Sequence, residues 1–144
     1  MVDRFNVKKN KTERTWFIDL DGTIFEHNSY LYGKNIVLKK VKFFLNEIPS
    51  DDCLIFVTAR PRKYKNMTLK GLSLLDIDYD GIIFNVSSGT RVIVNDKKDS
   101  GKFTALAINK RRNDQNFPFF LFKKFRYNSL INFFKNLIYN HKYY

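Results

Sequence analysis

The sequence has little cysteine, alanine or proline, and it has no long apolar run. The one cysteine, Cys53, begins a short apolar run, which excludes a framework of disulfide bonds and favours a small core residue in a reducing compartment. No window approaches the roughly 20 apolar residues that span a bilayer, and residues 1–30 lack the pattern of a signal peptide. We therefore expect a soluble, cytoplasmic protein.

Acidic residues are also scarce. The chain has 14 Asp and Glu against 26 Lys and Arg, which gives a formal net charge of +12. Such a balance is typical of proteins that bind nucleic acid, anionic lipid or phosphorylated substrates. The chain is equally rich in Asn, Phe, Tyr and Ile, as AT-rich coding alone would produce. Both explanations of the charge stay open.

What the sequence does contain is a series of short apolar runs that alternate with helical patterns. The runs predict strands at 15–18, 53–57, 81–84, 91–94 and, more briefly, 104–108. Between them, residues 37–48 carry apolar side chains at helical spacing up to Pro49, and residues 62–75 alternate Lys with Met and Leu. This alternation predicts an α/β fold with a mainly parallel sheet. The length of 144 residues, 44% of them hydrophobic, suits one domain.

The two ends of the chain differ from this central part. Residues 1–14 are polar and mostly basic, and we interpret them as an N-terminal arm before a domain at 15–116. Residues 117–144 hold 11 aromatic residues in 28 positions and no acidic one, with a helical pattern from Ser129. Three interpretations of this tail stay open: a helix packed on the sheet, a homo-oligomer contact or site cover, or a basic amphipathic helix on a membrane surface.

The strongest motif is Asp19-Leu20-Asp21-Gly22-Thr23, directly after the first apolar run. Two carboxylates at a strand end, followed by glycine, can both reach the cleft above the sheet, where ligands of parallel sheets bind. The alternative is an ordinary turn, since Asp-Gly is a common turn pair.

Two later strands are also followed by polar groups. Thr58 and Arg60 follow the second run, where a hydroxyl and a guanidinium suit phosphate oxygens. Asn95 and Asp96 follow the fourth run and add a third carboxylate. The carboxyl ends of parallel strands meet at one edge of a sheet, so we expect these groups to share a site.

In this order the motifs resemble those of the haloacid dehalogenase (HAD) superfamily. Its phosphatases carry Asp-x-Asp-Gly-Thr after the first strand, Thr or Ser after the second and an acidic motif after the fourth, and the likeness covers roughly residues 15–108. The chain is most similar to the small capless members, whose last motif ends as Asn95-Asp96-Lys97 does. The resemblance implies a Rossmann-like three-layer α/β/α fold without a cap domain. The lengths between the motifs leave room for little more than one loop and one helix each, so the site should be open.

The resemblance also implies the role of each residue. Asp19 would be the nucleophile that forms an aspartyl-phosphate, and Asp21 the acid and base. Thr58 would bind the phosphate. Asp19, Asp96 and the backbone carbonyl of Asp21 would hold Mg²⁺. The implied activity is that of a magnesium-dependent phosphomonoesterase.

One expected group is missing. The superfamily usually has a Lys that bridges nucleophile and phosphate, and residues 85–91 before the fourth run contain none. Arg60 and Arg91 are the first candidates to replace it as phosphate-binding residues, and Lys97 is the next candidate.

The function stays open between three possibilities. The first is hydrolysis of a small phosphorylated metabolite such as a phosphosugar or glycan precursor, by analogy with similar capless chains. The second, not favoured, is nucleic acid with a terminal phosphate, which the net charge of +12 and the aromatic tail support. The third is a HAD-like binding protein without catalysis.

Overall fold

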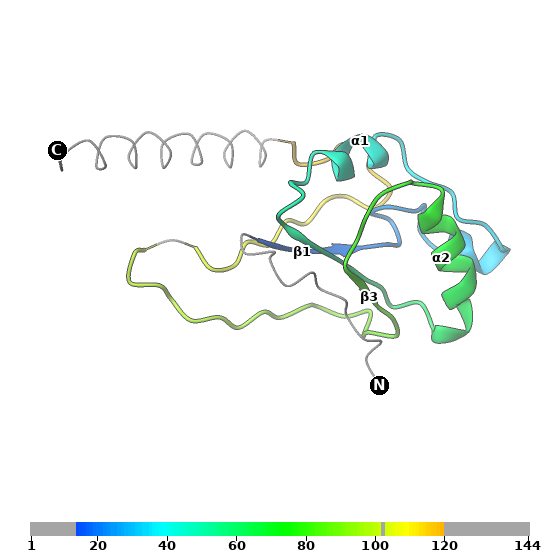
Figure 1. Ribbon diagram of the computed structural model, residues 1–144. Helices are drawn as coiled ribbons and strands as arrows, with labels where there is room; N and C mark the ends of the chain where they lie inside the picture. Colours follow the sequence, from blue (N-terminus) through cyan, green and yellow to red (C-terminus); the bar gives the residue numbers. More distant parts are fainter. Residues whose placement is uncertain (1–13, 102, 120–144) are drawn as a thin grey trace.

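The computed structural model describes residues 14–101 and 103–119. Three parallel strands form its sheet in the order β1-β2-β3: β1 (Thr15–Asp19), β2 (Cys53–Val57) and β3 (Gly81–Ile83). The connections contain two α-helices, α1 (Val41–Asn46) and α2 (Lys65–Ser73), and two 3₁₀ helices, η1 (Ser29–Tyr32) and η2 (Arg62–Tyr64). This part of the chain is a small α/β fold, which confirms the predicted fold class and the first three predicted strands (Figure 1).

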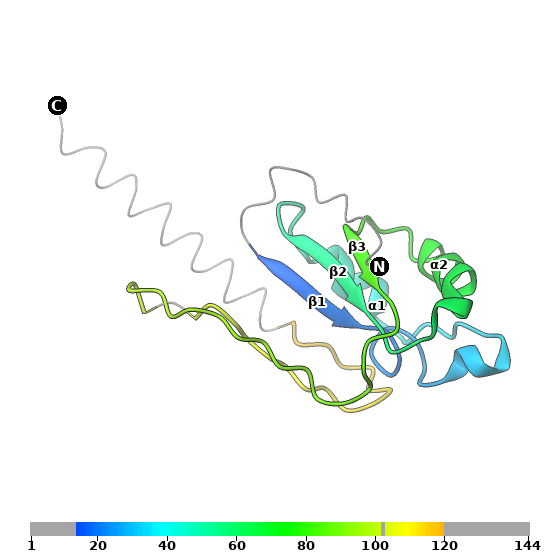
Figure 2. The same cartoon turned by 90° about the horizontal axis from the view of Figure 1, so that it is seen from below.

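The register of the strands brings their carboxyl ends to one edge of the sheet. Asp19 at the end of β1 lies opposite Val57 at the end of β2, which in turn lies opposite Ile83 of β3. All three strands point the same way in Figure 2. The loops after β1 and β2 therefore start from the same edge, where parallel sheets bind ligands.

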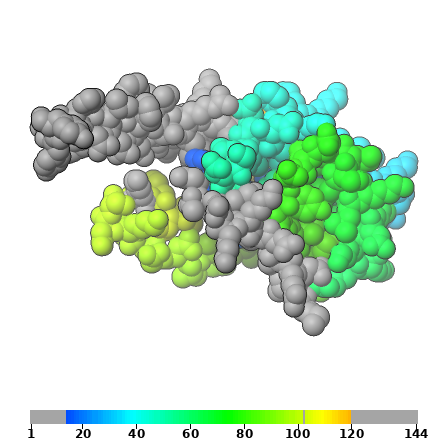
Figure 3. All heavy atoms as spheres, in the orientation of Figure 1, coloured from blue at the N-terminus to red at the C-terminus, as the bar shows by residue number. Residues whose placement is uncertain are grey.

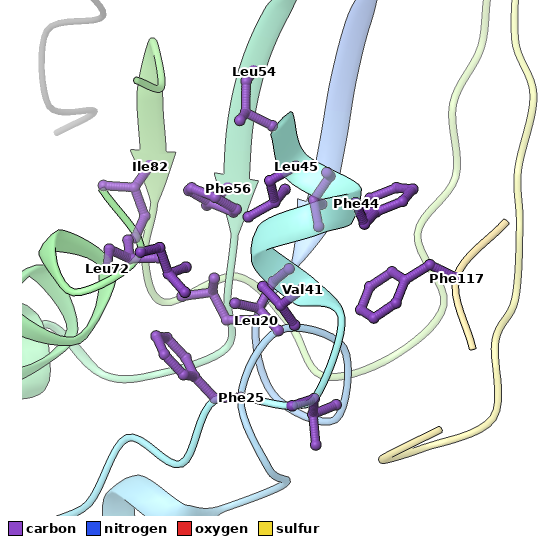
Figure 4. Close-up of a cluster of buried hydrophobic side chains, with 14 of the residues drawn as sticks. Leu20, Phe25, Val41, Phe44, Leu45, Leu54, Phe56, Leu72, Ile82 and Phe117 are labelled. Atoms are coloured by element: carbon purple, nitrogen blue, oxygen red, sulfur yellow. The ribbon is translucent and has the colours of Figure 1, made fainter. Parts of the chain in front are cut away.

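Both α-helices pack on one face of the sheet. Phe44 of α1 and Leu72 of α2 belong to the same buried cluster as Leu54 and Phe56 of β2. Figure 4 shows these side chains gathered around α1, with Phe117 closing the cluster on the side of Phe44. Burial of this apolar surface against the helices is what holds the sheet and helices together.

The opposite face of the sheet is different. Because successive side chains of β2 point to opposite faces, Cys53, Ile55 and Val57 form a second, smaller cluster on this face. No helix of residues 14–101 and 103–119 contributes to it. Phe17 of β1 is 55% exposed. The part of the chain that the structure describes thus has two layers, and it does not confirm the three-layer arrangement implied by the resemblance.

The predicted strands at 91–94 and 104–108 are not strands in the structure. Both stretches run away from the sheet as an extended excursion (Figures 1 and 2). The side chains of Val92 and Val94 are 80% and 89% exposed. A strand exists only as part of a hydrogen-bonded ladder, and neither stretch pairs with β1, so apolar composition alone predicted the wrong structure here.

The predicted helices are confirmed in place but differ in length. The apolar pattern at 37–48 predicted a helix that begins four residues before α1 does. Val37 instead forms an isolated bridge with Phe25, and Lys40 has a positive φ of 63°. Because a left-handed residue cannot continue a right-handed helix, α1 starts only at Val41.

The ends of the described chain pack more closely than the sequence indicated. Arg14, assigned to the arm, donates from Nε to Asp52 Oδ2 at 2.9 Å, and its carbonyl accepts the N–H of Cys53 at 2.7 Å. Phe117, assigned to the tail, is buried and stacks on Phe44 with ring centroids 4.7 Å apart. The rest of the predictions for the arm and the tail falls on residues 1–13 and 120–144, outside the described residues.

No helix within residues 14–101 and 103–119 has the length and apolarity that a membrane crossing requires.

Asp52 is the buried carboxylate that joins β1 to the start of β2. It is 1% exposed and accepts hydrogen bonds from Arg14 Nε and, at 2.7 Å, from Trp16 Nε1. We predict that Asp52→Ala lowers the free energy of unfolding by about 2 kcal/mol, because two donors lose a charged acceptor. Urea denaturation measures this. The free energy of unfolding of Asp51→Ala, at the neighbouring exposed position, should stay within about 0.5 kcal/mol of that of the parent. Equal losses of stability in both variants would contradict the stabilising role of Asp52.

Candidate active site

The loop after β1 holds both carboxylates of the motif. The amide N–H groups of Thr23, Ile24 and Phe25 all donate to the carbonyl of Leu20, whose side chain is fully buried. Gly22 has a φ of 84°, which L side chains rarely adopt. These contacts make a tight turn that keeps Asp19 and Asp21 at the carboxyl edge of the sheet.

Asp19 is paired with an arginine. Its Oδ1 accepts a hydrogen bond from Arg91 Nη2 at 2.8 Å, and its Oδ2 accepts one from Thr23 Oγ1 at 3.3 Å. Burial raises the pKa of Asp19, against the charge and hydrogen bond of Arg91, and the nearby Asp21 carboxylate raises it further. The Asp19 side chain is still 31% exposed, so solvent and small ligands can reach it.

Asp21 is held by a different arginine. Arg60 presents two nitrogens to it: Nη2 donates to Oδ1 at 2.8 Å, and Nε donates to Oδ2 at 2.9 Å. Thr58 Oγ1 donates to the same Oδ2 at 3.3 Å. The result is a bidentate pair of the kind that fixes the orientation of a carboxylate.

Arg60 itself is fully buried, which the sequence did not indicate. Its Nη1 donates to Asn35 Oδ1 at 2.7 Å and to Thr68 Oγ1 at 3.0 Å. The rings of Phe25 and Tyr30 flank the guanidinium, with centroids 5.0 and 4.5 Å from its central carbon. We expected Arg60 to bind phosphate, and in this structure the guanidinium is instead enclosed by protein groups.

Thr58, the other expected phosphate-binding residue after β2, is also buried. Its hydroxyl donates to Asp21 and accepts the backbone N–H of Arg60 at 3.1 Å. The hydroxyl therefore supports the Asp21 pair in this arrangement.

Asp96 lies apart from the other two carboxylates. It is exposed within the extended excursion, where its carbonyl accepts a hydrogen bond from Thr104 Oγ1 at 2.7 Å. Across residues 14–101 and 103–119 there is no group of three or more His, Cys, Asp and Glu side chains placed to hold a metal ion. The structure brings together Asp19, Asp21, Thr58, Arg60 and Arg91, and it does not bring Asp96 to them.

The turn at 110–114 is a neighbour of the site that sequence reasoning missed. The N–H of Asn113 donates to the Gly22 carbonyl at 2.9 Å, and Asn113 Oδ1 accepts the N–H of His27 at 2.8 Å. A Cβ on Gly22 would come within 2.9 Å of Arg112 Cγ, so this arginine packs directly on the motif loop. The Asn-Asp turn pair after three basic residues was the only sequence signal of this contact.

The space-filling view shows how far the excursion stands from α2 (Figure 3). Its yellow-green atoms project on the side of the molecule opposite the green atoms of α2. Arg91 reaches Asp19 from residues 87–101, which are exposed, whereas Arg60 reaches Asp21 from a buried position.

No family model, curated protein or solved structure matches this chain.

Asp19 lends itself to a test by stability. A carboxyl whose pKa is raised by folding stabilises the native state at low pH, and that contribution is lost as the pH rises through the raised pKa. We therefore predict that Asp19→Asn is more stable than the parent at pH 7 and that the difference shrinks as the pH is lowered. Thermal unfolding between pH 4 and pH 7 measures it. Asp78→Asn, at an exposed position, is the control. The prediction is refuted when the stability of Asp19→Asn minus that of the parent is smaller at pH 7 than at pH 4.

Proposed function

We propose that the chain is a magnesium-dependent phosphomonoesterase of the HAD type, which acts on a small phosphorylated metabolite such as a phosphosugar or glycan precursor. One observation carries the proposal: a partly exposed aspartate at the carboxyl edge of a parallel sheet, with an arginine on one oxygen and a second aspartate two residues on. An anionic nucleophile, a cation for phosphate and an acid–base group are the parts that such a reaction needs.

The proposed reaction has two steps. An Asp19 oxygen attacks phosphorus, the bond from phosphorus to the leaving oxygen breaks, and Asp21 gives that oxygen a proton. A water then loses a proton to Asp21 and attacks the same phosphorus, so the bond to Asp19 breaks and inorganic phosphate leaves. Asp19 is then a carboxylate again, and Asp21 again carries the proton with which the cycle began.

Arg91 takes the part of the missing lysine in this proposal. Its Nη2 is 2.8 Å from Asp19 Oδ1, and its side chain is 46% exposed. A phosphate that approaches Asp19 can therefore form a charge-assisted hydrogen bond to the same guanidinium. This support is absent for Arg60, which is enclosed, and no contact ties Lys97 to Asp19 within residues 14–101 and 103–119.

Magnesium fits the donor chemistry of the site. Mg²⁺ prefers carboxylate and carbonyl oxygens and is commonly held by one or two carboxylates together with a substrate phosphate. The carboxylate of Asp19 and the backbone carbonyl of Asp21 offer these oxygens, and Asp96 belongs to the proposed set through the resemblance alone. When bound, the ion would neutralise the repulsion between the nucleophile and the phosphate.

The finer fold is part of the same proposal. In the described residues β1 pairs only with β2, so one of its edges is open to a further strand. We propose that this sheet is part of a HAD-like three-layer α/β/α fold without a cap domain.

A second candidate, removal of a terminal phosphate from nucleic acid, is favoured by one observation. Arg111 and Arg112 are exposed on the turn that packs on the motif loop. Two cations beside the site would suit further phosphates of a strand, with strong salt dependence.

The first test is phosphate release from phosphosugars, nucleotides and a phosphate-ended oligonucleotide, with and without Mg²⁺. We predict release that needs both Mg²⁺ and Asp19, with Asp19→Asn as the blank. Preference for a phosphosugar supports the metabolite, whereas preference for the oligonucleotide with a steep fall in salt supports the second candidate. Absence of release from every substrate by a folded protein would reject the hydrolase in favour of a binding protein.

Arg91 gives a separate prediction. Arg91→Met should lower kcat/KM by about 10²-fold, because transition-state charge on the phosphoryl oxygens loses a donor. Since Arg91 lowers the pKa of Asp19, its removal should also move the acidic limb of the pH profile to higher pH. Lys98→Met, which removes a charge from the same exposed segment, is the control. An unchanged acidic limb in Arg91→Met would contradict the pairing.

A further inference from the structure

Arg60 is the most deeply placed charge of the site. It is 0% exposed, and four of its donor hydrogens are accounted for by Asp21, Asn35 and Thr68. A buried guanidinium is costly unless it is paired and hydrogen-bonded. A substrate cannot displace these partners without exposing the charge to apolar surroundings, so the contact between Arg60 and Asp21 is built into the fold.

The same network reaches the helix α2. Thr68 and Met67 both lie on α2, and Thr68 Oγ1 accepts Arg60 Nη1 directly. Asn35 makes the second link, because its Oδ1 accepts Arg60 while its Nδ2 donates to the Met67 carbonyl at 2.8 Å. Asn35 also packs on Gly71, where a Cβ would come within 2.7 Å of its side chain. The guanidinium thus joins α2 and the loop before α1, which contains Asn35, to the carboxyl group of Asp21.

We propose that Arg60 is a positioning residue: through its fork it holds the carboxyl group of Asp21 in one orientation, from which the acid form transfers its proton to the leaving oxygen. This inference rests on the proposed phosphatase function. The fork takes both oxygens of Asp21, and Thr58 adds a third contact to Oδ2, so rotation of the carboxylate is restricted. Asp21 keeps 14% of its side chain exposed toward solvent, which leaves it accessible to a substrate.

The leaving group separates this role from a merely structural one. Proton donation matters for an alkyl phosphate, whose alkoxide leaves poorly, and little for p-nitrophenyl phosphate, whose phenolate leaves without help. A loss of folded protein lowers the turnover of both substrates equally. A misplaced acid lowers only the turnover of the alkyl ester.

The experiment is the kcat of the full chain with Mg²⁺ for the preferred alkyl phosphate and for p-nitrophenyl phosphate. We expect Arg60→Lys, which keeps the charge but loses the fork, to slow the alkyl ester about 10²-fold and p-nitrophenyl phosphate less than about 10-fold. In an Asp21→Asn background the same change should add no further loss. Arg62→Lys, the same substitution at an exposed position two residues on, is the matched control.

Thr68 keeps the test open should Arg60→Lys fail to fold. Thr68→Val removes one acceptor of Arg60 Nη1 with little change in volume, and Thr68→Ser restores the hydroxyl. We expect the leaving-group dependence to rise in the valine variant and to return to that of the parent in the serine variant. Equal losses for both substrates, or additive losses in the Asp21→Asn background, would overturn the inference and leave the phosphatase standing. A parent protein that releases no phosphate would overturn both.

Discussion

A fully buried guanidinium has to be compensated on every side, and much of the described structure follows from compensating Arg60. The charge is met by Asp21, the remaining donors by Asn35 and Thr68, and the faces of the group by aromatic rings. These partners come from the loop after β1, the loop before α1, and α2. Because removal of Asp21, Asn35 or Thr68 leaves a buried donor of Arg60 unmatched, the geometry of the site and the packing of α2 depend on each other.

The strands could be predicted from the sequence because their signal is local. Buried parallel strands need continuous apolar runs, and β1, β2 and β3 each coincide with one. The run at 91–94 carries the same signal, yet it is exposed. Whether such a run becomes a strand depends on a partner edge, which lies far away in the sequence. For the same reason local periodicity placed α1 but not its first residue, which the bridge between Phe25 and Val37 decides.

The site also contains features that the sequence predicted and features that only the structure shows. The pattern of Asp19 and Asp21 after a strand predicted that they lie at one edge, and the register of β1 and β2 accounts for it. The sequence left Arg60 and Arg91 as alternatives for one role. Only the three-dimensional contacts separate them, because the partners that enclose Arg60 are 25 and 8 residues away along the chain and carry no motif.

The two ion pairs of the site differ most in exposure, and this difference assigns them different work. The pair of Asp19 and Arg91 has both side chains partly in water, 31% and 46% exposed, so a phosphate can replace one partner at low cost. The pair of Asp21 and Arg60 is closed on the arginine side, so separating it would strand a charge among apolar groups. In the proposed reaction, an anion that enters the site would compete for Arg91 and leave Arg60 in place. The exposed pair would then serve binding, and the enclosed pair would serve orientation.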